Sequence, residues 1–205
     1  MPSGSKSGAL EPVDDETSPA TVRKAAAADE AALLRYIAAG DRKAFDALYR
    51  CYFPRLTRFL ERVMRRPHAV EEVLNDTMLV VWRKAGTFNA RSKVSTWIFS
   101  IAYRKALKAI KRFDDPVEPD EERVESTEPG PEQELMHRQR SKLLLQQVAR
   151  MSAEHRTVIE LTYYHGCAYR EIAQIMDCPV DTVKTRMFHA RRRLRQFLAD
   201  RRQEL

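Results

Sequence analysis

The sequence predicts an all-α protein of two small helical domains joined by a flexible acidic linker, with a helix-turn-helix as the C-terminal domain. Apolar residues recur at helical spacing from Asp29 onward, and no alternating run bounded by turn dipeptides predicts a strand. The 205 residues suffice for one mid-sized domain or two small ones. An acidic, Pro-rich stretch between two helical regions favours two.

The first half of the chain predicts a tail and then a helical domain at 29–112. Residues 1–28 are rich in Ser, Gly, Pro, Ala and acidic residues without periodicity, so a disordered N-terminal tail is expected. Gly40 should end a short first helix, and Asp41 is placed to cap the next one. Pro54 lies inside that second helix and should kink or briefly break it. Two more helices are expected at about 69–85 and 95–112.

The second half predicts a linker and a second domain at 135–205. Residues 113–134 hold ten acidic residues and four prolines, a composition that cannot bury enough apolar area to offset its ordering entropy. Helical periodicity resumes near Leu135, Ser152 is placed to cap a new helix, and Gly166 should end it. A short helix at 169–176, a tight turn and a longer helix from Val180 then make the helix-turn-helix.

Charge is distributed unevenly along the chain. Residues 31–112 hold 18 basic and 6 acidic residues, residues 113–134 hold 1 and 10, and residues 135–205 hold 14 and 7, so the net charges are +12, −9 and +7. Basic surfaces of this density attract polyanions. Both domains are therefore expected to contact nucleic acid, although the acidic stretch alone is also what a solvated linker would carry.

The last helix has an apolar stripe and an opposite cationic face. Placing residues 100° apart puts Val183, Met187 and Ala190 on the stripe, which must pack on the preceding helices. The opposite face is typical of a helix in a DNA major groove, where polar groups contact base edges and flanking cations hold phosphates. The alternative is an Arg-rich helix that is only a solvated surface. The expected duplex-binding residues are Lys184, Thr185, Arg186, Phe188, His189, Arg191, Arg192 and Arg193.

The helix at 95–112 combines cations with an aromatic residue on its outer face. Single-stranded nucleic acid is bound by such a mixture, since bases stack on aromatic rings while cations neutralise phosphates. Trp97 could equally be core beneath a neighbouring helix. The outer face gathers Arg104, Lys108, Lys111 and Arg112, with Trp97 and Ile101 among them.

Acidic residues gather on the helix at 69–85. Half of the six acids in residues 31–112 lie there, beside an outward-facing Leu and Trp. This patch should repel DNA and resembles the core and rim of a protein interface. The alternative is an acidic first turn that suits the helix dipole, with the Trp packed on another helix. The expected protein-binding residues are Glu71, Glu72, Asn75, Asp76, Leu79 and Trp82.

Residues 41–112 and 135–198, about two thirds of the chain, resemble one family, and three stretches within them carry the resemblance. They are VEEVLNDTMLVVWRKAGTF (70–88), STWIFSIAYRKALKAIKR (95–112) and YREIAQIMDCPVDTVKTRMFHARRRL (169–194). In this order, with a short acidic connector, they are similar to the extracytoplasmic-function (ECF, group IV) sigma factors of bacterial RNA polymerase. The resemblance implies an alternative sigma factor that directs core polymerase to specific promoters and promotes DNA melting.

The resemblance also implies a role for each surface. The acidic face would dock on the β′ clamp helices of the polymerase, the last helix would contact the −35 duplex, and the linker would thread the channel later used by RNA. The loop and basic helix would melt the −10 element. The −10 residues so implied are Phe88, Asn89, Arg91, Lys93, Ser95, Trp97, Arg104, Lys108, Lys111 and Arg112. Many members carry Asn where this chain has Arg104, and an acid or Asn where it has Lys108.

No constellation in the sequence supports catalysis, so we expect no enzyme activity and no cofactor. His165, Cys167 and Cys178 could form only a partial metal site, and we expect no bound metal. No run of apolar residues approaches the length of a membrane span, and the three cysteines suit a reducing compartment, so a cytoplasmic protein is expected. The family resemblance implies an anti-sigma factor as a further partner. The rival functions are a stand-alone helix-turn-helix transcriptional regulator and a recombinase or nuclease.

Overall fold

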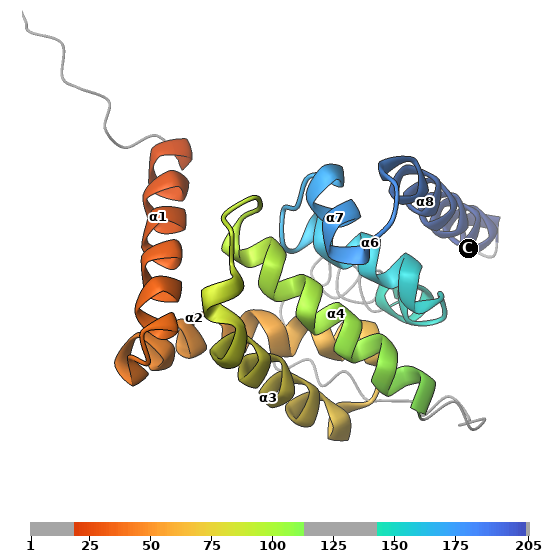
Figure 1. Cartoon of the computed structure of the whole chain (residues 1–205). Coiled ribbons are helices and arrows are strands. Elements are labelled where there is room, and N and C mark those ends of the chain that lie inside the picture. Colours follow the sequence, from red (N-terminus) through yellow and green to blue (C-terminus); the bar gives the residue numbers. More distant parts are fainter. Residues whose placement is uncertain (1–18, 113–142, 204–205) are drawn as a thin grey trace, which may run out of the picture.

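The structure, a computed structural model, describes residues 19–112 and 143–203, and the regular structure in these ranges is helical throughout. The expected linker at 113–134 and the tail up to residue 18 lie outside the described residues. The first half consists of α1 (Pro19–Ala38), α2 (Arg42–Met64), α3 (Pro67–Lys84), a 3₁₀ turn (Ala85–Thr87) and α4 (Val94–Arg112) (Figure 1). No helix of the described residues is long and apolar enough to cross a membrane.

The N-terminal cap predicted for α2 is present, and Gly40 lies where the preceding helix was expected to end. Asp41 Oδ1 accepts hydrogen bonds from the backbone N–H groups of Lys43 and Ala44 at 2.8 and 3.3 Å, which satisfies two of the unpaired donors of the first turn. Gly40, between α1 and α2, has φ +88°, a conformation that glycine adopts without strain. The short α1–α2 connection thus follows from its sequence.

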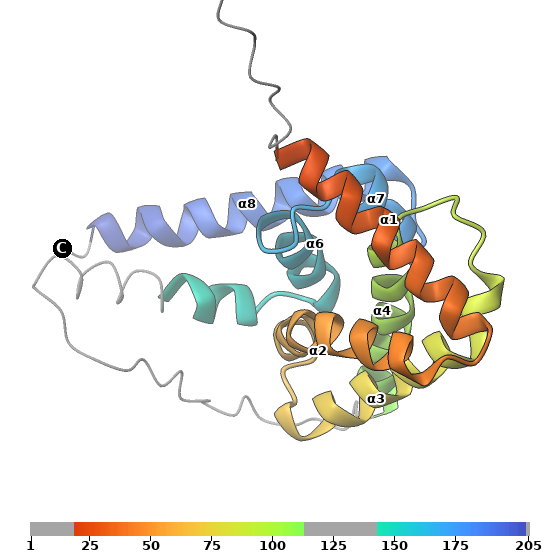
Figure 2. The ribbon, with the colours of Figure 1, turned by 90° about the vertical axis from the view of Figure 1, so that its left-hand side faces the viewer.

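The second half consists of a helical segment at 143–149, α6 (Ala153–Tyr163), α7 (Tyr169–Met176) and α8 (Val180–Gln203). Ser152 caps α6 by accepting the His155 N–H, as predicted. Asp177, with φ 51°, ends α7 in the left-handed conformation. α8 is the longest of these helices and extends well past α6 (Figure 2).

The two halves pack on one another, α2 beside α6 and α4 beside α7 (Figures 1 and 2). A single buried cluster contains Phe59 and Phe99 from the first half and Leu161 and Ile172 from the second. Arg156 of α6 also reaches across, where its Nη2 donates to the Val63 carbonyl at 2.5 Å. The sequence did not predict this shared core.

Two observations differ from the expectations for the first half. α1 begins at Pro19, inside the segment expected to be disordered, and its Leu34 and Ile37 are buried in the core. α2 runs through Pro54 without a break. Buried side chains on α2, including Leu48 and Leu56, continue on both sides of the proline, so packing holds the helix together.

Candidate nucleic-acid interface

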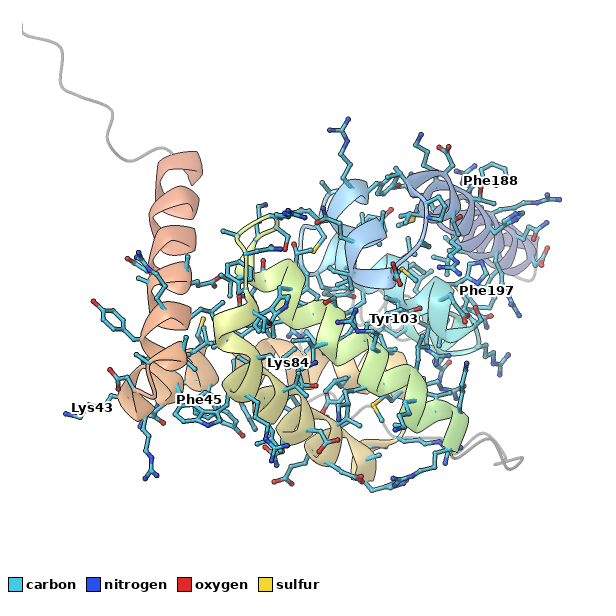
Figure 3. All side chains as sticks on the ribbon, in the orientation of Figure 1. Lys43, Phe45, Lys84, Tyr103, Phe188 and Phe197 are labelled. Atoms are coloured by element: carbon cyan, nitrogen blue, oxygen red, sulfur yellow. The ribbon has the colours of Figure 1, made fainter. Side chains whose placement is uncertain are left out.

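α8 presents the predicted duplex-binding face to solvent. Its stripe residues Val183, Met187 and Ala190 are buried against α6 and α7, which turns the opposite face outward. Phe188 is 59% exposed and points away from the fold (Figure 3). The other predicted residues, Lys184, Thr185, His189, Arg191, Arg192 and Arg193, are also exposed, and Arg186 is half-buried.

Short-range contacts hold parts of this face. Lys184 Nζ lies 2.9 Å from Asp181 Oδ1, one turn earlier, and this exposed pair lowers the pKa of the Asp181 carboxyl. Arg191 Nε donates to the Tyr163 hydroxyl at 3.0 Å and so ties the helix to the end of α6. The aromatic rings of Phe188 and His189 lie edge to face, 5.6 Å apart. The face is thus a cationic surface that carries two exposed rings, one apolar (Phe188) and one imidazole (His189).

The helix-turn-helix is tied to the first half of the chain through Glu171 of α7. One carboxylate oxygen, Oε2, accepts the Ala168 N–H at 2.8 Å and caps α7, while Oε1 lies 2.7 Å from Lys93 Nζ in the loop before α4. The hydrogen bonds from Lys93 and from the Ala168 N–H lower the pKa of this carboxyl against the effect of its burial. Lys93, predicted at the −10 surface, is therefore paired in this arrangement.

The structure brings the predicted −10 residues together along one loop and one helix. The Phe88 and Trp97 rings lie 5.6 Å apart at the start of α4, and both are half-buried. Asn89 accepts the Arg91 N–H at 3.2 Å, which shapes the loop, and Arg104 donates to Ser100 Oγ at 3.3 Å. Lys108, Lys111 and Arg112 are exposed along the last turns of α4, and Ser95 is half-buried.

One residue of that stripe is placed differently from the expectation. Ile101 is only 5% exposed, although the sequence put it among the outward-facing cations. α4 packs against α2 and α3 and also against α7, so it has two covered faces. The expectation that Ile101 faces outward is wrong, because Ile101 belongs to the core cluster that both halves share. Part of the packing on α4 comes from α7, about 70 residues later in the sequence, which helical periodicity within α4 could not predict.

The acidic face of α3 is exposed as predicted, and part of it is paired. Leu79 is 43% exposed, whereas Trp82 is half-buried with its ring 5.2 Å from Phe45 of α2. Asp76 Oδ2 lies 2.8 Å from Lys105 Nζ, and Asn75 Oδ1 accepts from the Tyr49 hydroxyl at 3.1 Å.

A second cation of α4 also reaches the acidic face. Glu72 Oε1 lies 3.6 Å from Arg112 Nη2, and Glu71 is exposed. Such exposed pairs stabilise little and can be exchanged for a partner's cations. Sequence periodicity could place Tyr49 and Lys105 on their helices but not against these acids.

Comparison with known proteins finds one matching family model in each half of the chain. The family model described as Sigma-70 region 2 matches residues 48–115, and the one described as Sigma-70, region 4 matches residues 141–194. The ECF RNA polymerase sigma factor RpoE of Cereibacter sphaeroides is 30% identical over 78% of this chain and 88% of that protein. The ECF RNA polymerase sigma factor SigW of Bacillus subtilis is 26% identical over 82% and 95%.

Solved structures are similar in fold. The sigma factor RpoE from Bartonella quintana, in complex with the anti-sigma factor NepR, aligns with a TM-score of 0.56 at 25% identity over 77% of this chain and 98% of that one. CnrH, in complex with the cytosolic domain of CnrY, aligns with a TM-score of 0.62 at 22% identity over 84% and 98%. This second likeness concerns the fold alone.

Proposed function

The chain belongs to the ECF sigma factors of bacterial RNA polymerase, and from that membership we propose which of its surfaces meet the polymerase and the promoter. It is an alternative sigma factor that directs core polymerase to promoters. We propose that α8 contacts the −35 duplex, that the loop at 88–95 and α4 hold the −10 strand, and that the α3 face binds the β′ clamp helices.

The exposed face of α8 is the observation that carries the promoter assignment. Lys184, Thr185, His189 and Arg192 can donate to base edges or phosphates, and Phe188 suits an apolar contact with a thymine methyl group. The buried stripe beneath them fixes the face in one orientation. A stand-alone regulator would present a similar helix, but family membership in both halves of the chain disfavours it.

The −10 assignment rests on the loop and the exposed end of α4. Cations at Lys108, Lys111 and Arg104 would follow the phosphates of a single strand, and the Phe88–Trp97 pair would offer a stacking surface. The polymerase assignment rests on the exposed Leu79 beside two exposed carboxylates, whose present partners are the half-buried Lys105 and the exposed Arg112. An anti-sigma factor, as bound to the B. quintana RpoE, would be a further partner.

Reconstituted transcription tests the proposal. Adding the chain to purified bacterial core polymerase on a randomised promoter library should select one −10 and −35 combination. Glu72→Lys with Asp76→Lys should abolish core binding in a pull-down, because two negative charges on the α3 face that would meet the β′ clamp helices become positive. The matched control is Asp46→Lys with Glu61→Lys, two exposed acids of α2 that bring the same change in net charge.

Two results would contradict these assignments. Transcription no better than with core polymerase alone would contradict promoter direction by this chain. Core binding that survives in the Glu72/Asp76 variant as well as in the control would remove the α3 face from the interface and leave the family membership untouched.

A further inference from the structure

A hollow of about 350 Å³ lies between the start of α6 and the exposed face of α8, two helices that pack side by side (Figure 2). His155 lines it from α6, and His189, Arg192 and Arg193 line it from α8. These three α8 side chains are exposed and belong to the surface for which we propose contact with the −35 duplex. None of the described residues that line the hollow is acidic. The proposed duplex surface therefore continues from α8 to the start of α6.

The groups around His155 determine where its ring carries a proton. Burial raises the pKa of the Glu154 carboxyl, but hydrogen bonds from its own backbone N–H and from Ser152, with the charge of Arg186, lower it overall. Because the Ser152 hydroxyl gives its proton to this carboxylate, its oxygen can only accept from His155 Nδ1, 2.8 Å away. A neutral His155 ring therefore has its proton on Nδ1 and none on Nε2. Burial and the Glu154 carboxylate raise the pKa of Tyr103 of α4 to about 12 against the charge of Arg186, so this phenol stays neutral.

Protonation of His155 would create a donor at Nε2, a nitrogen that makes no hydrogen bond among the described residues. Burial lowers the pKa of His155, and the opposing charge of Glu154 does not compensate for the charges of three α8 residues, His189, Arg186 and Arg193. The free chain therefore holds this ring mainly neutral at pH 7. An anion in the hollow would favour the charged form.

A DNA phosphate is the anion that the α8 surface would bring to this hollow. In a major groove, the base-reading face of a helix lies between two phosphate walls, which the side chains on its flanks contact. Arg193 lies on the flank of α8 that borders the start of α6. A phosphate that pairs with Arg193 on this flank would therefore lie at the hollow that His155 lines.

We propose that His155 is a further residue of the duplex contact: as an imidazolium, it donates from Nε2 to a DNA phosphate that Arg193 also holds. This inference rests on the proposed contact between α8 and the −35 duplex. Duplex binding then takes up a proton at this ring, so the affinity rises as the pH falls from 8 to 6. The contact positions the duplex and reads no base.

The test is binding of the library-selected promoter duplex by the full chain assembled with core polymerase. Each phosphate contact contributes about 0.9 to the slope of log affinity against log salt concentration. His155→Gln should therefore lower that slope by about 0.9 at pH 6 and leave it unchanged at pH 8, where the wild-type ring is neutral. His155→Lys, which is charged at both pH values, should show the pH 6 wild-type slope at both. The matched control His68→Gln, an exposed histidine at the start of α3, should behave as the wild type.

Equal slopes for the wild type and His155→Gln at pH 6 would overturn the inference. The same loss of affinity in His155→Gln and His155→Lys at both pH values would overturn it too, because that result gives His155 a structural role only. Arg192→Ala separates this inference from the proposed function. If Arg192→Ala weakens binding and His155→Gln does not, the α8 contact stands and the inference fails; if neither variant changes binding, both fail.

Discussion

Replacing Tyr52 by Phe should destabilise the first half of the chain by removing one buried hydroxyl group. Tyr52 is fully buried, and its hydroxyl donates to Glu30 Oε2 at 2.9 Å, which joins α2 to α1. Burial and the Glu30 carboxylate raise the pKa of Tyr52 far above its ordinary value, so the hydroxyl keeps the proton that it donates. The substitution leaves the ring in place and removes this one bond.

The magnitude follows from the two groups involved. A hydrogen bond to a charged group stabilises a protein by about 1.5–3 kcal/mol. Arg55 stays 3.6 Å from Glu30 and still pairs with it, so we expect a loss of about 2 kcal/mol, in the lower part of that range. For a chain of this size the melting temperature should fall by roughly 4–8 °C.

Tyr49→Phe is the matched control in urea or thermal unfolding. The Tyr49 hydroxyl donates to Asn75 at 3.1 Å on the exposed surface, where water replaces the lost bond, so its removal should cost less than about 0.5 kcal/mol. Equal losses in the two variants, or a loss below about 0.5 kcal/mol for Tyr52→Phe, would refute the reasoning that α1 is held by a buried, charge-assisted bond.

Three further predictions concern the second half of the chain. Burial lowers the pKa of His165 from 6.5 to about 4. The contribution of His165 to the free energy of unfolding is therefore present above pH 6.5 and is lost as the pH falls toward 4. His165→Gln should reduce this acid-induced loss of stability, measured by urea unfolding, by up to about 3 kcal/mol. Gly166→Ala, at φ +61° with open space around the added methyl, should cost about 1 kcal/mol from backbone strain alone, and no change in urea midpoint would contradict that. Glu171→Ala should lower the melting temperature more than Lys93→Ala does, because it removes the α7 cap as well as the exposed ion pair; equal effects would contradict the cap.

Helical periodicity predicted the parts of the fold in which each helix has one covered face. Val183 and Met187 of α8 are buried where the pattern placed them, and Asp41 and Ser152 cap the helices that they precede. A periodic pattern contrasts one apolar face with the rest of a helix, which is enough for these elements. It also placed the exposed face of α8, because that face is the complement of the buried one.

The pattern could not predict contacts that depend on a second partner. Ile101 shares a face of its helix with cations yet is buried in the shared core, and Arg156 is buried although arginine is seldom buried. Arg156 donates to the carbonyl groups of Ala149 and Met151 as well as Val63, so backbone acceptors compensate for its burial. Such acceptors leave no signal in the sequence, since every residue carries one.

The packing of α7 on α4 bears directly on the proposed −10 contact. α7 packs on α4, and its Glu171 pairs with Lys93 in the loop before α4, so a DNA strand cannot lie along the covered part of α4 while the two halves stay packed. If α4 holds the −10 strand, the halves must separate there. The ion pair opposes separation little, because Lys93 is largely exposed. The main cost is the exposure of Phe59 and Phe99, at roughly 25 cal/mol per Å² of apolar surface, and contacts with the polymerase and the promoter would have to supply it.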